Sequence, residues 1–132
     1  RLVMVWSAGR KNYVHRIVDH IFRDLPRPDW IFTYDNLEEL PDNTFIKPLA
    51  KIWSLPQFKS IMSERNSLII DDRKTVFWEP NRDNGIQIPP YRPPFTLAGV
   101  EESDDELLKL KAWLLKNKSG GDVRKLDKSH IF

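Results

Sequence analysis

Two adjacent carboxylates, Asp71 and Asp72, directly follow a short apolar stretch, residues 68–70, that is typical of a buried strand. Like charges at the end of such a strand repel each other and lose solvation. A bound cation would offset both costs, and hard oxygen ligands of this kind suit Mg²⁺. The simpler alternative is that both carboxylates cap a turn or pair with the neighbouring Arg73 and Lys74.

Two further polar residues stand where elements are expected to begin or end. Ser7 follows the first apolar run within Ser-Ala-Gly. Its hydroxyl and the exposed backbone N–H groups of such a turn can hold a phosphate. Lys47 lies beside Pro48 at an expected loop-to-helix junction, where an ammonium can neutralise a phosphoryl group or a carboxylate. An ordinary turn and an ordinary surface lysine are the alternatives at these two positions.

Segments with strand periodicity alternate along the chain with segments of helix periodicity. These predicted strands and helices would position the polar side chains. Apolar runs predict strands over residues 2–6, 30–34, 67–72 and 86–88. Steps of three and four residues predict helices over 12–25, with Asn12 as N-cap, from Pro48 onward, and between Ser103 and Gly120. This order predicts an α/β fold with a mainly parallel sheet. Ligands bind outside the carboxyl ends of such strands, which is where Ser7, Asp71 and Asp72 are expected.

The composition sets broader bounds. The 132 residues are enough for one domain, and 40% are hydrophobic and 30% charged, as in a globular protein. The absence of cysteine excludes disulfides, thiolate metal sites and cysteine nucleophiles. The net charge of +2 argues against a polyanion-binding tail as the main theme, and the tryptophans do not alternate with basic residues, so no direct nucleic-acid binding is expected. Apolar runs fall short of the ~20 residues that span a bilayer, so no membrane span is expected.

The order of these motifs resembles motifs II, III and IV of the haloacid dehalogenase superfamily. Within it, the sequence is similar to the NLI-interacting-factor-like phosphatases that act on the C-terminal repeats of RNA polymerase II, whose homology domain nuclear-envelope and mitochondrial import proteins share. The residues that carry the resemblance are Val5-Trp6-Ser7-Ala8-Gly9, Lys47-Pro48-Leu49, Ile52-Trp53, Asn66-Ser67-Leu68-Ile69-Ile70-Asp71-Asp72, Asn84-Gly85-Ile86-Gln87-Ile88 and Asp122-Val123-Arg124. They run from about Val3 to Arg124.

The resemblance implies a haloacid-dehalogenase-like three-layer sandwich over residues 1–124, followed by a C-terminal tail, 125–132. It also implies a Mg²⁺-dependent phosphatase that removes phosphate from serine or threonine of a phosphoprotein or peptide through an aspartyl-phosphate. Asp72 would be the direct metal ligand, and Asp71 its neighbour, oriented near Lys47. Ser7 would hydrogen-bond the phosphoryl oxygens, and Lys47 would stabilise the aspartyl-phosphate. The nucleus is the location that the resemblance favours, with the mitochondrion as the alternative.

Two departures from the family pattern qualify this interpretation. The first motif, Asp-x-Asp-x-Thr, which carries the nucleophile, does not occur in the sequence, and Arg73-Lys74 follows Asp72 where relatives have a small residue and proline. In the family fold the first-motif strand lies at the centre of the sheet. We therefore expect that the chain is incomplete, that upstream residues or a second chain supply the central strand and the nucleophile, and that residues 1–132 alone are inactive.

Two other functions are kept as alternatives. The missing motif also fits a catalytically inactive homologue that binds a protein or peptide. A small-molecule or nucleic-acid 3′-phosphatase of the same superfamily is less favoured, because the flanking residues fit the protein-phosphatase branch better. The proline-rich loop 89–94 either borders the substrate or rigidly connects the sheet to the last helix.

Overall fold

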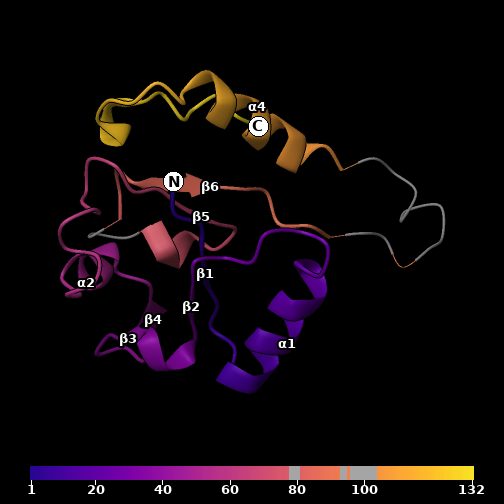
Figure 1. Cartoon of the computed structure of the whole chain (residues 1–132), viewed down its shortest axis with the longest axis vertical. Helices are drawn as coiled ribbons and strands as arrows, with labels where there is room; N and C mark the ends of the chain where they lie inside the picture. Colours follow the sequence, from indigo (N-terminus) through magenta and orange to yellow (C-terminus); the bar gives the residue numbers. More distant parts are fainter. Residues whose placement is uncertain (78–80, 93–94, 96–103) are drawn as a thin grey trace. The chain divides into compact units, whose positions relative to one another are not determined.

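The computed structural model describes residues 1–77, 81–92, 95 and 104–132. The chain divides into two compact units, Arg1–Lys47 and Pro48–Phe132. Figure 1 labels the elements of both. The first unit contains β1 (Met4–Trp6), α1 (Lys11–Ile21), β2 (Trp30–Phe32), the 3₁₀ turn η1 (Tyr34–Asn36), β3 (Glu38–Glu39) and β4 (Phe45–Ile46). The second contains α2 (Leu49–Trp53), β5 (Ile69–Asp71), η2 (Lys74–Phe77), β6 (Gly85–Gln87), α4 (Glu106–Lys116) and η3 (Val123–Lys125).

In the first unit, β1 and β2 form a parallel pair with α1 as the crossover helix. Val5 lies opposite Ile31 in the register. Val14 and Val18, one turn apart on α1, are each 3% exposed, because this apolar edge of the helix faces the interior of the unit. The strand–helix–strand order of the sequence thus produces the parallel pairing that it predicts.

The bounds of α1 differ from the prediction of a helix from Asn12 to Leu25. The helix begins at Lys11 after Arg10, which makes no side-chain capping hydrogen bond, and it ends at Ile21. The apolar period continues to Leu25, but the Leu25 side chain is 61% exposed. Further helix would therefore bury little additional apolar surface, so periodicity overestimates the length here.

In the second unit, β5 and β6 form another parallel pair, in which Ile70 lies opposite Ile86. One hydrophobic cluster of this unit joins this pair to α4. Its buried members are Ile86, Leu110 and Ile131, and the partly buried side chains that pack against them are Leu68, Ile88, Trp113 and Leu114. Residues from β6, from α4 and from the extreme C-terminus therefore share one cluster.

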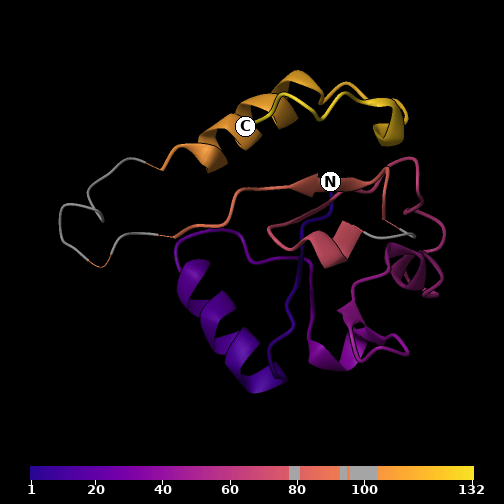
Figure 2. The same ribbon diagram turned by 180° about the vertical axis from the view of Figure 1, so that it is seen from behind.

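Residues 125–132, which the sequence predicts to be a polar tail, make specific contacts. The segment runs back along α4 (Figures 1 and 2). Ile131 is 7% exposed, and the Trp113 indole N–H donates to the Asp127 carbonyl at 2.9 Å. These contacts attach to α4 a segment that polar composition alone does not distinguish from a tail. The domain boundary at residue 124 stays a prediction.

The mixture of helices with parallel strand pairs confirms an α/β fold. Among the described residues the strands form three two-stranded sheets, β1–β2, β3–β4 and β5–β6. The three-layer sandwich therefore stays a prediction. The sequence predicts Ser103 as the N-cap of the last helix, but α4 begins at Glu106 with Asp105 as its N-cap. Ser103 itself and residues 93–94 of the proline-rich loop lie outside the described residues. The helices that are described are all too short or too polar to cross a membrane.

Candidate functional site

Ser7 lies directly after the carboxyl end of β1, and two hydrogen bonds to neighbouring backbone groups fix its position. Its N–H donates to the Phe32 carbonyl at 3.1 Å, which extends the β1–β2 ladder by one residue. Its Oγ accepts a hydrogen bond from the Gly9 N–H at 3.0 Å. Because the hydroxyl oxygen acts as the acceptor in this turn, its hydrogen stays available for donation to an oxygen of a bound group.

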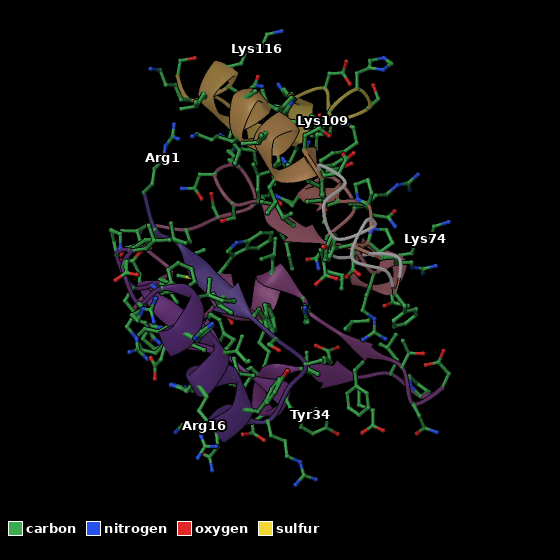
Figure 3. The ribbon with its side chains drawn as sticks, turned by 90° about the vertical axis from the view of Figure 1, so that its right-hand side faces the viewer. Arg1, Arg16, Tyr34, Lys74, Lys109 and Lys116 are labelled. Atoms are coloured by element: carbon green, nitrogen blue, oxygen red, sulfur yellow. The ribbon has the colours of Figure 1, made fainter. Side chains whose placement is uncertain are left out.

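The turn after Ser7 requires glycine because Gly9 is packed against α1. A Cβ at Gly9 would lie 2.9 Å from Val14 Cγ2 and 3.1 Å from Tyr13 Cδ1. The Gly9 carbonyl also accepts from the Tyr34 N–H at 2.9 Å, which ties this turn to the end of β2. Tyr34, labelled in Figure 3, begins η1 and stacks obliquely on Phe45, with ring centroids 5.2 Å apart. The loop that carries Ser7 is therefore held at both ends.

Lys47 follows β4, the second strand of the antiparallel β3–β4 hairpin. Asn43 closes this hairpin with a positive φ of 61°, a conformation that asparagine tolerates better than most residues. Lys47 is only 9% exposed, although lysine is among the residues that are most rarely buried. The sequence predicts Pro48 in the first turn of a helix, and the structure places it one residue earlier, as the N-cap of α2, which begins at Leu49.

Asp71 and Asp72 stand at the carboxyl end of β5 and differ in their surroundings. The Asp71 carboxylate accepts a hydrogen bond from the Arg73 N–H at 3.0 Å, so it organises the turn that leads into η2. Lys74, labelled in Figure 3, begins that turn of helix. Asp72 is exposed, and its carbonyl accepts from Gln87 Nε2 at 3.2 Å.

These surroundings favour Asp72 over Asp71 as a ligand for a hard cation. Within the described residues, no hydrogen bond or ion pair engages the Asp72 carboxylate, whereas Asp71 already accepts a backbone N–H. A single exposed carboxylate fits Mg²⁺, which binds proteins through one or two carboxylates and retains several waters. No cluster of three Asp, Glu or His side chains occurs in the described part of the chain.

Two buried asparagines, Asn81 and Asn84, brace this region and were missed as site residues by sequence reasoning. Asn84 is 3% exposed, and its amide donates to the carbonyls of Glu64 at 2.6 Å and Ser67 at 2.8 Å. Asn81 is 1% exposed; its amide accepts from the Leu49 N–H and donates to the Val76 carbonyl. Buried amides of this kind are stable only when such partners are present. Asn84 belongs to a quoted motif, but the sequence around Asn81 has no signal for these contacts.

The motif Asp122-Val123-Arg124 forms a compact charged corner. Arg124 bonds the Asp122 carboxylate through two guanidinium nitrogens, and Asp122 also accepts from the Arg124 backbone N–H at 3.1 Å. These hydrogen bonds, Arg124 side chain first, hold the pKa of Asp122 well below its ordinary value of 3.8. The corner is structural: it joins the C-terminal segment to the loop before β5.

The four predicted site residues fall in both units. Ser7 and Lys47 belong to Arg1–Lys47, and Asp71 and Asp72 belong to Pro48–Phe132. Within each unit the structure places these residues at the carboxyl end of a strand in a parallel pair: Ser7 directly follows β1, Asp71 is the last residue of β5, and Asp72 follows it. The grouping of all four in one site stays a prediction.

The comparison with known families covers nearly the whole chain. The family model described as NLI interacting factor-like phosphatase matches residues 2–124. This range contains Ser7, Lys47, Asp71 and Asp72, and it confirms the resemblance that the motifs indicate. No curated protein matches the sequence significantly. Because the match extends far beyond the motifs themselves, the chain belongs to the family of NLI interacting factor-like phosphatases.

Proposed function

We propose that this chain belongs to a Mg²⁺-dependent phosphatase that hydrolyses phosphoserine or phosphothreonine in proteins through an aspartyl-phosphate. The observation that carries the proposal is the position of Ser7 and of Asp71–Asp72. Both lie at the carboxyl end of a strand in a parallel pair, with Asp71 as the last residue of β5, within a chain whose family is a phosphatase family. This end of a parallel strand is where α/β folds bind ligands.

The hydrogen-bond pattern of β1 and β5 supports a further strand. Val3 and Ser7 direct their backbone bonds toward β2, so the alternate residues, Met4 and Trp6, present theirs on the opposite edge. In β5, Ile69 and Asp71 likewise bond to the β6 side, which leaves the Ile70 backbone for the other edge. Within the described residues, each strand has one partner. We propose that a strand from outside residues 1–132 pairs with these edges, completes the three-layer sandwich and carries the nucleophilic aspartate.

The predicted site residues Ser7 and Lys47 would assist a reaction of two steps. The nucleophilic carboxylate oxygen forms a bond to phosphorus while the bond from phosphorus to the serine or threonine oxygen breaks, and a neighbouring acid protonates that leaving oxygen. Water then attacks phosphorus, the acyl-phosphate bond breaks, and inorganic phosphate leaves. Ser7 would donate its hydroxyl hydrogen to a phosphoryl oxygen, and the Lys47 ammonium would offset the charge of the transferring group.

The two carboxylates after β5 would serve different purposes. Asp72 would hold Mg²⁺ through a side-chain oxygen, and the bound ion would neutralise negative charge on the phosphoryl group. Asp71 would keep the turn in shape through the bond from the Arg73 N–H. Its carboxylate would orient Lys47, as the resemblance implies.

Hydrolysis of p-nitrophenyl phosphate by the full-length protein that contains residues 1–132, with and without Mg²⁺, tests the proposal. Mg²⁺-dependent turnover that extends to phosphoserine and phosphothreonine peptides is the expected result. Turnover of small phosphate esters or of nucleic-acid 3′-phosphates, without turnover of peptides, would overturn the substrate assignment. Nuclear residence, proposed from the resemblance alone, is tested separately by imaging the tagged protein.

A protein- or peptide-binding module without catalysis is the second candidate. Two observations favour it: Asp-x-Asp-x-Thr does not occur in the sequence, and Arg73-Lys74 replaces the usual residues after Asp72. In this case no turnover occurs even when the full-length protein and Mg²⁺ are present. Phosphopeptide binding without turnover would decide in favour of this candidate.

A further inference from the structure

The link between β5 and η2 carries the carboxylate that is proposed to bind the metal ion. Asp72 and Arg73 alone connect β5, which ends at Asp71, to η2, which begins at Lys74. Both linking residues are exposed, so no surrounding side chains enclose them. Hydrogen bonds to the backbone of such a link decide how well its conformation is defined. The direction of the Asp72 carboxylate therefore depends on the partners that the neighbouring peptide groups find.

The peptide unit between Asp72 and Arg73 is bonded through both of its polar groups. Its carbonyl, which belongs to Asp72, accepts a hydrogen bond from Nε2 of Gln87 at 3.2 Å. Its N–H, which belongs to Arg73, donates to Oδ1 of Asp71 at 3.0 Å. Both distances lie within the ordinary range for N–H···O hydrogen bonds. The plane of this peptide unit is therefore held at both ends, and Gln87 holds the carbonyl end.

The peptide unit before Asp72 is held as well. The Asp71 carbonyl accepts from the Ile88 N–H at 3.1 Å, which continues the ladder of the β5–β6 pair. Because peptide units are planar, holding the units on both sides of Asp72 restricts its φ and ψ, the two soft backbone angles of a residue. The bond from Ile88 uses only the backbone and tolerates any side chain except proline. The bond from Gln87, by contrast, depends on the residue type at that position.

We propose that Gln87 is a positioning residue that orients Asp72 for Mg²⁺ by holding the Asp72 carbonyl. The inference rests on the proposed function, because it concerns the ion that Asp72 would hold. Gln87 would contact neither the ion nor the reacting atoms. It lies with Asp71 and Asp72 in the unit Pro48–Phe132, and in the register of the parallel pair it is opposite Asp71. Such indirect partners of a metal ligand fix its orientation before the ion binds.

Gln87→Met tests the proposal, because methionine has a similar length and volume but no N–H donor. The affinity of the full-length protein for Mg²⁺, measured without substrate by titration calorimetry, should fall by about 10-fold. This is the lower end of the range for indirect partners of metal ligands. We expect the lower end because Gln87 is exposed and water can partly replace its amide.

Hydrolysis of p-nitrophenyl phosphate by the same variant separates positioning from a merely structural role. The Mg²⁺ concentration that gives half-maximal activity should rise by about 10-fold, with a much smaller change in kcat at saturating Mg²⁺. A structural defect would instead lower kcat at every Mg²⁺ concentration. That result, together with an unchanged affinity for Mg²⁺, would overturn the proposal.

Gln57→Met is the matched control, because Gln57 is also exposed and its amide makes no hydrogen bond within the described residues. Both variants should unfold at similar urea concentrations, since each replaces an exposed side chain. Gln57→Met should bind Mg²⁺ as tightly as the unsubstituted protein. An equal loss of affinity in the two variants would show that the bond to Asp72 is not the cause, and the proposal would fail.

Gln87→His restores a donor and distinguishes positioning from direct coordination by Gln87. The imidazole Nε2 is as many bonds from Cα as the glutamine Nε2, and at pH 8 the ring is neutral and can donate one N–H. Mg²⁺ takes oxygen ligands, so imidazole is a poor substitute for a coordinating amide oxygen. Positioning therefore predicts a higher Mg²⁺ affinity than in Gln87→Met. Equally low affinities in both variants would contradict it.

Mg²⁺ binding and turnover together distinguish failure of this inference from failure of the proposed function. Mg²⁺-dependent turnover with an unchanged Mg²⁺ affinity in Gln87→Met would leave the phosphatase proposal standing and overturn the role of Gln87. Mg²⁺ binding without turnover would reject the phosphatase proposal, and a 10-fold loss of affinity in Gln87→Met would still support positioning of Asp72. No Mg²⁺ binding by the unsubstituted protein would overturn both.

Discussion

Arg124 forms a bidentate pair with the carboxylate of Asp122, with Nε 2.9 Å from Oδ1 and Nη2 2.6 Å from Oδ2. Its third nitrogen, Nη1, lies 2.7 Å from Oε1 of Glu64, and the N–H of Val123 donates to the carbonyl of Arg65 at 2.9 Å. The charged corner therefore connects the segment after α4 to the loop that precedes β5. A fork of this geometry is stronger than a single exposed ion pair.

The low pKa of Asp122 predicts loss of stability in acid. Because the folded state lowers this pKa from 3.8, mainly through the Arg124 side chain, the carboxylate stabilises the fold fully above about pH 4. The contribution disappears as the pH falls through the lower pKa of the folded state. Urea unfolding measured at a series of pH values below about 4 should show a free energy of unfolding that rises with pH, and Asp122→Asn should reduce this pH dependence.

Asp24→Asn is the control for the acid prediction. Asp24 pairs with Arg23 at 3.4 Å, but both side chains are more than 70% exposed, so solvent screens the pair. Its removal should leave the pH dependence unchanged. If Asp122→Asn had the same pH dependence as the unsubstituted protein, the corner would not contribute to folding in the way described.

Asp72→Asn should abolish most of the Mg²⁺-dependent activity while leaving the fold intact. The exposed carboxylate has no structural partner among the described residues, so its loss costs little stability. Activity at limiting Mg²⁺ should fall by at least about 100-fold, since even indirect partners of metal ligands contribute 10- to 100-fold. The measurement is a Mg²⁺ titration of p-nitrophenyl phosphate hydrolysis by the full-length protein, with exposed Asp83→Asn as the control. Unchanged Mg²⁺-dependent turnover would reject Asp72 as a ligand.

Ser7→Ala tests whether the hydroxyl contacts the phosphoryl group. The bond from the Ser7 N–H to the Phe32 carbonyl involves only the backbone and survives the substitution. We therefore expect a native circular dichroism spectrum with kcat/KM reduced by about 100-fold, the effect of losing one donor to a developing charge. Exposed Ser60→Ala should have no effect. Full activity in Ser7→Ala would mean that this hydroxyl serves the turn alone.

Ile131→Ala measures how firmly the C-terminal segment is attached. Ile131 packs with Ile86 and Leu110, so its truncation should lower the free energy of unfolding by about 2–4 kcal/mol. Leu108, on α4, is 64% exposed, and Leu108→Ala should cost less than about 0.5 kcal/mol. Equal, small effects of both substitutions in urea unfolding would show that residues 125–132 behave as a tail after all.

The family and the α/β fold class could be predicted from the sequence because both depend on local patterns. The order of Ser7, Lys47 and Asp71–Asp72 along the chain identifies the family, and the match over residues 2–124 confirms it. Alternating strand and helix periods predict parallel pairing, which β1–β2 and β5–β6 confirm. Element ends were less predictable, as the early end of α1 at Ile21 shows, because an end depends on what the next turn would bury.

Other features depend on contacts between residues far apart in the sequence, and only the tertiary structure decides them. Polar composition indicated a tail at residues 125–132, yet Ile131 joins a core built from β6 and α4. Asn81 resembles any polar loop residue until its amide is seen between Leu49 and Val76, 32 and 5 residues away. Local residue types determine which chemistry a position can perform. Whether a polar side chain meets solvent or a buried backbone group depends on packing, which no local pattern encodes.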